Sequence, residues 1–433
     1  MSPSTRPLPN AWLVLALLLA IALLNYADRY LISGLISHIQ KDFSTGDSYI
    51  GLLMGPAFAV LYTTLAVPFG WLADRWSRIG VIATGCIIWS VFTVLSGFAD
   101  NAGHLVLARI GVGIGEAAFS APAYALVAEY FAPERRTRAF AILGLSVYVG
   151  QIAGTVAGPA LAETAGWRTA FFVVGAPGIF VALLAWLIVR DPPRARPAVQ
   201  AGRSAFALAH AFARSRCFTF ATLGMAFGLL AGVSFGMWGP TLFARAYALD
   251  AKSAAALFGL AFGASGMAGM LAFGALADHQ VRRSLRAPLQ LAAIALAAAS
   301  AVTLAVTWAP SQSLALGLAL LGGLFGGGWS IGVTVTMQHL LPADIRATGT
   351  AALMMIASFV GVVFGPWVAG ALSEAVGQGL FGGGQGVNAA AFGLRVGLSA
   401  TIVTGFLGSI LLWRAARSLD KDREVFWGAA PAP

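Results

Sequence analysis

The chain has 433 residues, of which 58% are hydrophobic and only 10% are charged, and its formal net charge at pH 7 is +10. This balance excludes an ordinary soluble domain, in which about a quarter of the residues are charged. It predicts a membrane protein that crosses the bilayer many times. The two cysteines, Cys86 and Cys217, both fall at or within apolar runs, so no disulfide framework is expected.

Twelve apolar runs follow one another along the chain, and each is long enough to cross a bilayer as an α-helix at about 1.5 Å per residue. The first run is too long for a signal-peptide core and is expected to be a retained helix. The sequence therefore predicts an all-α polytopic membrane protein with twelve transmembrane helices. The predicted spans cover residues 11–37, 48–72, 79–99, 104–130, 138–163, 169–189, 217–243, 253–276, 287–308, 311–340, 347–373 and 394–414.

Basic residues are shared unevenly between the predicted loops. If the N-terminus is cytoplasmic, twenty of the 27 Lys and Arg residues lie in inner segments and five in outer segments, while Arg29 and Arg109 lie within the membrane. By the positive-inside rule, both termini are then cytoplasmic, and we expect a bacterial inner-membrane protein. The same distribution accounts for the net charge without a nucleic-acid partner and leaves membrane lipids as the expected partners of the basic face.

Two motifs occur twice at nearly the same spacing. The segment Gly70–Arg75 (GWLADR) follows the second run, and Gly274–His279 (GALADH) follows the eighth. A Gly-x-x-x-Gly-Pro motif occurs in the fifth run and again in the eleventh. This internal repeat predicts two pseudo-symmetric six-helix halves, as in repeat-built transporters. The second motif is expected to serve helix packing or a hinge through Gly154, Gly158, Pro159, Gly361, Gly365 and Pro366.

The segment between the two copies is rich in proline and arginine and ends in a short basic amphipathic stretch. This composition predicts a cytoplasmic linker with an interfacial helix at residues 190–216 rather than a third domain. We therefore expect an N-terminal half at residues 1–189 and a C-terminal half with a short cytoplasmic tail at residues 217–433.

Arg109 and Glu116 lie inside the fourth apolar run, which is otherwise almost uncharged. Their spacing is close to two helical turns, so both project from one face, about 10 Å apart in depth. Gly111, Gly113 and Gly115 remove side chains from the same turns and let a neighbouring backbone approach. A charge at the membrane centre costs about 2.5–3.5 kcal/mol on the mildest scale, which favours a functional interpretation. The alternative is a structural ion pair that only rigidifies the bundle.

These motifs resemble the major facilitator superfamily over the whole chain. Within it, five segments are similar to the Spinster branch, with the match concentrated in the N-terminal half; the second half departs from it, for instance at His279 where the first copy has Arg75. Spinster proteins of animals export sphingosine-1-phosphate or lysophospholipids, whereas organic-anion symporters of the superfamily share the Asn-Tyr-x-Asp-Arg and Gly-x-x-Glu-Ala elements. The five segments are Asn25–Arg29, Gly46–Ser48, Phe69–Arg75, Gly113–Ala117 and Val189–Pro193.

The resemblance implies that helices one, four, seven and ten line a central cavity. Asp28 lies about 25 Å along helix one and Arg109 about 8 Å from the outer end of helix four, at a comparable depth. The two are expected to face one another, with Glu116 one or two turns deeper. Arg29 is rotated by about 100° from Asp28. It is expected to contact either the substrate or groups within its own half, such as carbonyls or Tyr148.

This constellation suits anion binding linked to protonation. Burial disfavours the charged form of a carboxylate and a nearby guanidinium favours it, so small rearrangements can move a proton on or off. Arginine stays charged and binds phosphate or carboxylate in a bidentate manner. We therefore expect Asp28 and Glu116 to couple protons, and Arg109 and Arg29 to bind the substrate headgroup.

The membrane segments of the second half carry aromatic and methionine side chains and no intramembrane charge, which fits an amphipathic substrate or, alternatively, ordinary packing. The expected cavity-lining residues are Tyr26, Tyr148, Phe235, Trp238, Trp329 and Met337. A second cluster of charges lies at the predicted cytoplasmic face and, by resemblance, latches the two halves in the outward-facing state. It comprises Asp74, Arg75, Arg78, Glu129, Arg138 and Asp278.

The sequence thus predicts a secondary transporter that works by alternating access and moves an amphipathic anionic lipid, lysolipid-like or sphingosine-1-phosphate-like, coupled to protons through Asp28 and Glu116. The alternatives are a proton-coupled symporter of a water-soluble organic anion and an uncoupled uniporter of the same lipid. The chain contains no His-x-x-Glu-His motif and no Ser–His pairing at a matching depth. We expect neither an enzyme nor a metal or cofactor, and we expect a monomer.

Overall fold

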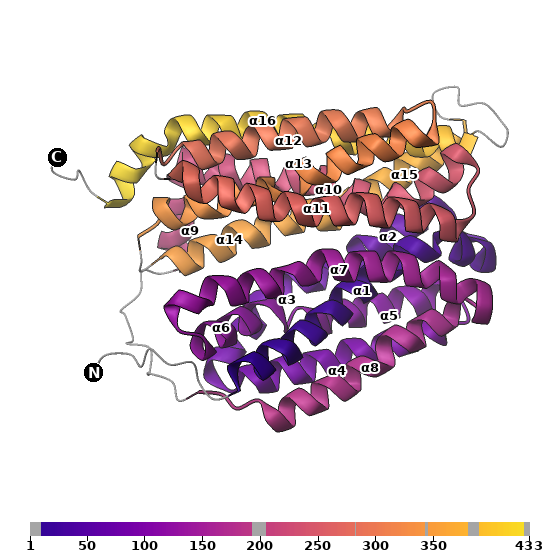
Figure 1. Cartoon of the computed structure of the whole chain (residues 1–433), viewed down its shortest axis with the longest axis horizontal. Helices are drawn as coiled ribbons and strands as arrows, with labels where there is room; N and C mark the ends of the chain where they lie inside the picture. Colours follow the sequence, from indigo (N-terminus) through magenta and orange to yellow (C-terminus); the bar gives the residue numbers. More distant parts are fainter. Residues whose placement is uncertain (1–9, 193–204, 282, 343–344, 380–388, 428–433) are drawn as a thin grey trace. The chain divides into compact units, whose positions relative to one another are not determined.

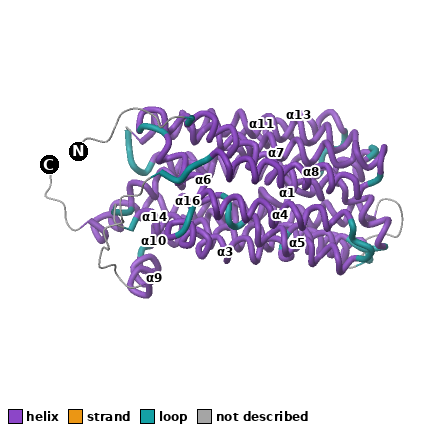
Figure 2. The backbone as a smooth tube through the Cα atoms, turned by 90° about the horizontal axis from the view of Figure 1, so that it is seen from below, coloured by secondary structure: helices purple, strands orange, loops and turns teal. Residues whose placement is uncertain are grey.

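The computed structural model describes residues 10–192, 205–281, 283–342, 345–379 and 389–427. Within these residues the chain is helical and forms no strand (Figure 2). Twelve helical segments of the described residues are long and apolar enough to cross a membrane. The predicted all-α fold with twelve spans is therefore confirmed.

The chain forms two compact units. Unit 1 consists of residues 1–195 and 243–259, and unit 2 of residues 196–242 and 260–433. A short segment that the sequence assigned to the second half therefore packs within unit 1. It forms two ion pairs there, Arg245 with Asp47 and Lys252 with Glu163.

Unit 1 contains six spans built from eight helices (Figure 1). Two of the spans are interrupted, one at Gly55 and one at Ala117–Phe119, where the chain makes a turn. Helix α1 packs along α7, and α4 packs against both α5 and α8. The helices are α1 (Ala11–Phe43), α2 (Asp47–Met54), α3 (Pro56–Arg75), α4 (Arg78–Gly97), α5 (Ala102–Glu116), α6 (Ser120–Tyr130), α7 (Pro133–Ala165) and α8 (Trp167–Ile188).

Small residues allow α1 and α7 to approach closely. A Cβ on Gly154 would meet the carbonyl oxygen of Ala27, and one on Gly34 would meet the ring of Pro159. A larger side chain at either glycine would force the helices apart. The first Gly-x-x-x-Gly-Pro copy therefore lies at a tight helix–helix contact, while its predicted hinge role stays a prediction.

Unit 2 contains the remaining spans except for residues 243–259, and its core is mainly apolar. The second Gly-x-x-x-Gly-Pro copy lies at a short π-helical turn, η1, where Gly361 packs on Leu229 and Gly365 on Leu230 of α10. π turns widen a helix locally and are often found at functional sites. The helices are α9 (Ala205–Arg214), α10 (Arg216–Tyr247), α11 (Ala251–Val281), α12 (Ala287–Thr307), α13 (Gln312–Leu340), α14 (Arg346–Ser358), η1 (Phe359–Phe364), α15 (Gly365–Gly377) and α16 (Ala389–Trp427).

Candidate functional site

Two ion pairs join α1 to α5 inside unit 1. Arg109 Nη1 lies 3.2 Å from Asp28 Oδ2, and Arg29 Nη2 lies 2.6 Å from Glu116 Oε2. The structure thus brings together the four residues that the sequence assigned to protons and headgroup. Asp28 faces Arg109 as expected. Arg29 bonds to Glu116, a partner that the sequence did not indicate.

The four side chains are removed from water to different degrees. The side chain of Arg109 is 1% exposed and that of Asp28 is 2% exposed, while Glu116 is 0% and Arg29 is 11% exposed. Ionised groups at such depth must be paired, because an isolated buried charge loses its hydration without compensation. Arg29 is thus the most exposed member of the cluster.

Aromatic rings surround the Arg29 guanidinium. Its Cζ lies 4.4 Å from the ring centre of Tyr62, 4.8 Å from that of Phe58 and 5.2 Å from that of Tyr26. Phe58 also lies 5.2 Å from the Cζ of Arg109, so this ring contacts both guanidiniums. Such contacts stabilise a cation by about 0.5–2 kcal/mol and leave its planar N–H groups free for an anion. The sequence pointed to Tyr26 but gave no signal for Phe58 or Tyr62.

Each carboxylate uses only one of its oxygens. Asp28 Oδ1 and Glu116 Oε1 are buried and have no hydrogen-bond partner within the described part of the chain. The Nε atoms of Arg29 and Arg109 are also buried and have no hydrogen-bond partner among the described residues. Buried polar atoms are usually satisfied, so a site with several free donors and acceptors can take up a proton or a ligand group.

Glycines of α5 position this helix. A Cβ on Gly113 would meet the carbonyl oxygen of Phe58 on α3, and one on Gly115 would meet the backbone of Gly85 and Trp89 on α4. The two glycines therefore let α5 lie directly against both neighbours, as the sequence predicted. This close contact holds Phe58 beside the ion pairs.

The comparisons with known proteins agree with this architecture. The model of the Major Facilitator Superfamily matches residues 18–366. The chain belongs to this superfamily. An MFS-type efflux pump of Mycolicibacterium smegmatis is 30% identical over 416 residues, which cover 95% of this chain and 94% of the pump.

Further relatives place this transporter in the Spinster branch. Protein spinster homolog 1 of Homo sapiens is 34% identical over 242 residues, which cover 54% of this chain and 46% of the human protein. The crystal structure of a bacterial homologue of the human lysosomal transporter Spinster, inward-facing and unoccupied, matches with a TM-score of 0.85 and 27% identity, covering 98% of this chain and 100% of that one. The chain is therefore an integral multi-pass membrane protein of a transporter family.

The expected cavity-lining residues of unit 2 are buried in packing contacts. Phe235 and Trp238 are 0% exposed, Met337 is 0% and Trp329 is 5% exposed. The Trp238 indole donates to the carbonyl oxygen of Pro366 at 2.9 Å, and Phe235 packs edge-on against Phe262. In this structure these four side chains are buried within unit 2, and their cavity-lining role stays a prediction.

The charge cluster that the sequence assigned to the cytoplasmic face is centred on Arg78. This residue forms ion pairs with Asp74, at 3.1 Å, and with Glu129. The Arg75 guanidinium instead stacks over the Trp71 ring at 3.9 Å. Arg138 is exposed and forms no ion pair with any described residue, and its expected partner Glu129 bonds to Arg78. The side chain of Asp278 lies outside the described residues, and the latch function of the cluster stays a prediction.

Two residues beside this cluster, Asp191 and Tyr130, were not among the predicted site residues. Both carboxylate oxygens of Asp191 accept backbone N–H groups at the start of α4, from Arg78 at 3.0 Å and from Ile79 at 3.3 Å. An anionic group is favoured there because a helix N-terminus carries unpaired N–H donors. The Tyr130 hydroxyl donates to the carbonyl oxygen of Arg190 at 2.5 Å. The segment after α8 is thereby fixed to the ends of α4 and α6.

A second ion-pair site lies at the opposite end of unit 1. Arg245 holds Asp47 with two N–H···O bonds of 2.6 Å each, and Gln40 donates to Asp47 at 2.8 Å. The pair is largely buried, with 19% of the Arg245 side chain and 9% of the Asp47 side chain exposed. The sequence indicated Asp47 only as part of the family-like segment Gly46–Ser48. Its ion pair could not be predicted, because the partner Arg245 lies almost 200 residues further along the chain.

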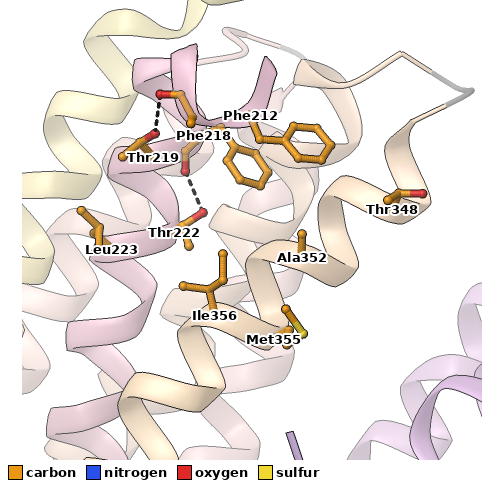
Figure 3. Close-up of a pocket in the computed structure, with 10 residues that line it drawn as sticks. Phe212, Phe218, Thr219, Thr222, Leu223, Thr348, Ala352, Met355 and Ile356 are labelled. Atoms are coloured by element: carbon orange, nitrogen blue, oxygen red, sulfur yellow. Dashed lines mark hydrogen bonds between the residues drawn. The ribbon is translucent and has the colours of Figure 1, made fainter. Parts of the chain in front are cut away.

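An apolar cavity of about 500 Å³ lies in unit 2 between α9, α10 and α14 (Figure 3). Phe212 of α9 and Phe218 of α10 stack at one end, with ring centres 4.6 Å apart. Met355 and Ile356 of α14 form the other wall. No charged side chain lines it among the described residues, so it can accept a hydrocarbon chain and offers no headgroup site.

Proposed function

We propose that this transporter moves an amphipathic anionic lipid, of the lysolipid or sphingosine-1-phosphate type, by alternating access and coupled to protons. The observation that carries the proposal is the pair of buried Arg–carboxylate contacts between α1 and α5, each with an unpartnered carboxylate oxygen. The site lies in the bacterial inner membrane, with both termini in the cytoplasm, as the distribution of basic residues favours.

Charge balance links the anion to the proton. When all four side chains are ionised, the carboxylates of Asp28 and Glu116 balance the guanidiniums of Arg29 and Arg109. An anionic headgroup that enters this apolar interior adds a negative charge, which is unfavourable without compensation. Uptake of one proton by a carboxylate restores neutrality. Anion binding and protonation therefore favour each other, and by linkage the coupling is reciprocal.

Arg29 receives the headgroup first. It is the most exposed member of the cluster, and its ring contacts hold the guanidinium plane while one N–H edge bonds Glu116. A phosphate that takes over this edge leaves Glu116 without a cationic partner in an apolar site, where the neutral acid is favoured. Arg109 and Asp28 form the deeper part of the site. Both carboxylates can therefore take up the coupled proton: Glu116 when the substrate displaces it from Arg29, and Asp28, our first choice of carrier, when its pair with Arg109 opens.

The amphipathic nature of the substrate follows from the composition of the rest of the molecule. The described core of unit 2 is mainly apolar and aromatic, and the cavity between α9, α10 and α14 is lined almost entirely by hydrocarbon. Such surfaces suit an alkyl chain better than a small hydrated anion. The names of the Spinster relatives do not specify a substrate, so the chemistry of the site carries this step.

A ligand screen by thermal shift tests the proposal. Lysophosphatidylglycerol and sphingosine-1-phosphate are expected to raise the unfolding temperature of the purified transporter, and succinate or gluconate to leave it unchanged. Stabilisation by the small carboxylates alone would identify an organic-anion transporter instead. If the lipids stabilise the protein but their apparent affinity does not vary with pH, an uncoupled uniporter is favoured.

Substitution of Arg109 tests the headgroup site directly. Arg109→Ala is expected to abolish lysolipid-dependent stabilisation, and Arg109→Lys to restore it poorly, because lysine lacks the planar fork that binds two oxygens. Arg168→Lys is the matched control, since Arg168 pairs with Asp42 at an exposed position. Wild-type ligand response in the Arg109→Lys variant would contradict this assignment.

A further inference from the structure

A groove between α12 and α16 combines an apolar floor with two arginines. It encloses about 440 Å³ and is lined by Ile294 and Ala297 of α12 and by Ile410, Trp413, Arg414 and Arg417 of α16. Both helices belong to unit 2, and they run side by side (Figure 1). Ile294 and Ile410 are 59% and 52% exposed, so the floor faces outward from unit 2.

Neither arginine pairs with a carboxylate of the described residues. Within the described part of the chain no ion pair involves Arg414 or Arg417, and both are exposed. The acidic residues nearest in sequence are engaged elsewhere: Asp420 pairs with Arg286. Asp422 is buried and accepts hydrogen bonds from the Ser215 hydroxyl, at 2.7 Å, and from the Cys217 backbone N–H. Two positive charges therefore remain at one end of the groove.

Helical spacing brings these charges together. Residues three apart on a helix lie on the same face with Cβ atoms about 5–6 Å apart, so Arg414 and Arg417 can contact one phosphate. Trp413 lies beside them and is 36% exposed. Tryptophan is enriched at the level of lipid headgroups, and the positive-inside bias assigns this end of α16 to the cytoplasmic leaflet. The arginines thus lie at headgroup level and the isoleucines at acyl-chain level.

We infer that this groove binds an anionic phospholipid of the cytoplasmic leaflet. Its phosphate lies between Arg414 and Arg417, and an acyl chain lies along Ile294, Ala297 and Ile410. Basic pockets between transmembrane helices at the cytoplasmic side are suited to such headgroups. The apolar cavity between α9, α10 and α14 is lined by no charged side chain. The α12–α16 groove therefore differs from it in recognising a headgroup.

Bound lipid would act on unit 2 as a whole. The phosphate would bridge two turns of α16 while the acyl chain contacts α12, so the lipid would stabilise the contact between the two helices. The same stretch of α16 is fixed to the start of α10 through Asp422 and to the segment before α12 through Asp420. The site is separate from the α1–α5 ion pairs of unit 1, and its existence does not depend on the transported substrate.

Native mass spectrometry of the purified full-length transporter, titrated with phosphatidylglycerol and with phosphatidylcholine, tests this site. The wild type is expected to retain one phosphatidylglycerol more tightly than the others and than any phosphatidylcholine. Arg414→Gln and Arg417→Gln are each expected to weaken this binding by about fivefold, and the double variant by about 25-fold. Equal retention of the two lipids by the wild type would overturn the inference.

Two variants distinguish specific lipid binding in the groove from nonspecific attraction of anionic lipids to a basic surface. Lys421→Gln removes an equivalent exposed charge from the same helix but outside the groove, and it is expected to change the affinity by less than about twofold. Ala297→Trp fills the floor while keeping both arginines, and it is expected to displace the tightly held lipid. A loss in Lys421→Gln as large as in Arg414→Gln, or unchanged binding in Ala297→Trp, would contradict the proposed site.

Discussion

At the residue scale, the main feature is a set of buried charges that stabilise one another only as pairs. Arg109 and Asp28 are 1% and 2% exposed, so removal of one leaves the other without compensation. We expect Arg109→Met alone to lower the free energy of unfolding by about 3–5 kcal/mol. The double variant Arg109→Met with Asp28→Leu is expected to recover most of this loss, because no buried charge remains.

Chemical unfolding of both variants, followed by tryptophan fluorescence, would measure this difference. The double variant should be stable and yet show no lysolipid response, which separates a functional role from a structural one. A double variant that is as unstable as Arg109→Met would mean that the pair itself is required for folding. If the double variant still binds lysolipid, Arg109 is not part of the headgroup site.

The same residues show how far sequence reasoning reaches at this scale. Asp28 and Arg109 could be matched because intramembrane charges are rare and depth along a helix is predictable from its rise. The Arg29–Glu116 bond could not be predicted, since a long arginine side chain can reach several neighbours. Phe58 and Tyr62 gave no signal, because aromatic residues in membrane helices mostly serve packing. Only the fold places them over a guanidinium.

At the element scale, the ion pair between Asp47 and Arg245 fixes the segment joining α10 and α11 to the start of α2. The pair is bidentate and largely buried. We expect Asp47→Asn to weaken this attachment by about 1.5–3 kcal/mol, the usual range for hydrogen bonds to charged groups. Hydrogen exchange of the backbone amides near Asp250 should then become faster.

The chain offers a matched control for this prediction. Lys252 and Glu163 form an ion pair on the same segment, but their side chains are 54% and 42% exposed and 3.2 Å apart. An exposed pair contributes about 0–1 kcal/mol, so Glu163→Gln should change the exchange rates little. Equal effects of the two substitutions would show that burial of the Asp47–Arg245 pair is not what holds the segment.

The elements themselves were largely predictable from the sequence. Runs of apolar residues defined all twelve spans, because a helix satisfies all its backbone hydrogen bonds within one such run. The breaks within spans were not predicted. The turn at Ala117–Phe119 and the π turn at Phe359–Phe364 contain apolar residues that would equally continue an α-helix. Tertiary contacts decide such local changes, and hydropathy does not report them.

At the scale of the whole molecule, the repeat predicted two halves, and the described chain forms two compact units whose limits differ from that division. Residues 243–259 pack in unit 1, because Arg245 and Lys252 find their acidic partners there. Hydropathy and motif spacing could not indicate this, since they carry no information on which charges meet across 89 or 198 residues of sequence. The placement ties one end of α10 to the unit that holds the charged site.

Proton coupling is a property of the whole transporter and can be tested in proteoliposomes. Asp28→Asn keeps the size of the side chain and fixes it in a neutral form, so Arg109 loses its anionic partner but the site can no longer gain or lose a proton there. We expect this variant to exchange lysolipid across the membrane but to lose accumulation driven by an imposed proton gradient. Its exchange rate should also vary less with pH than that of the wild type.

Asp42→Asn is the control for this experiment, because Asp42 lies on the same helix in an exposed ion pair with Arg168. It should accumulate substrate like the wild type. If Asp28→Asn accumulates substrate against its gradient with unchanged pH dependence, Asp28 is not the proton carrier. Glu116→Gln then becomes the decisive variant, since Glu116 has the second unpartnered carboxylate oxygen. If neither substitution affects accumulation, the buried carboxylates only balance the arginines, and an uncoupled uniporter explains the site better than a proton-coupled one.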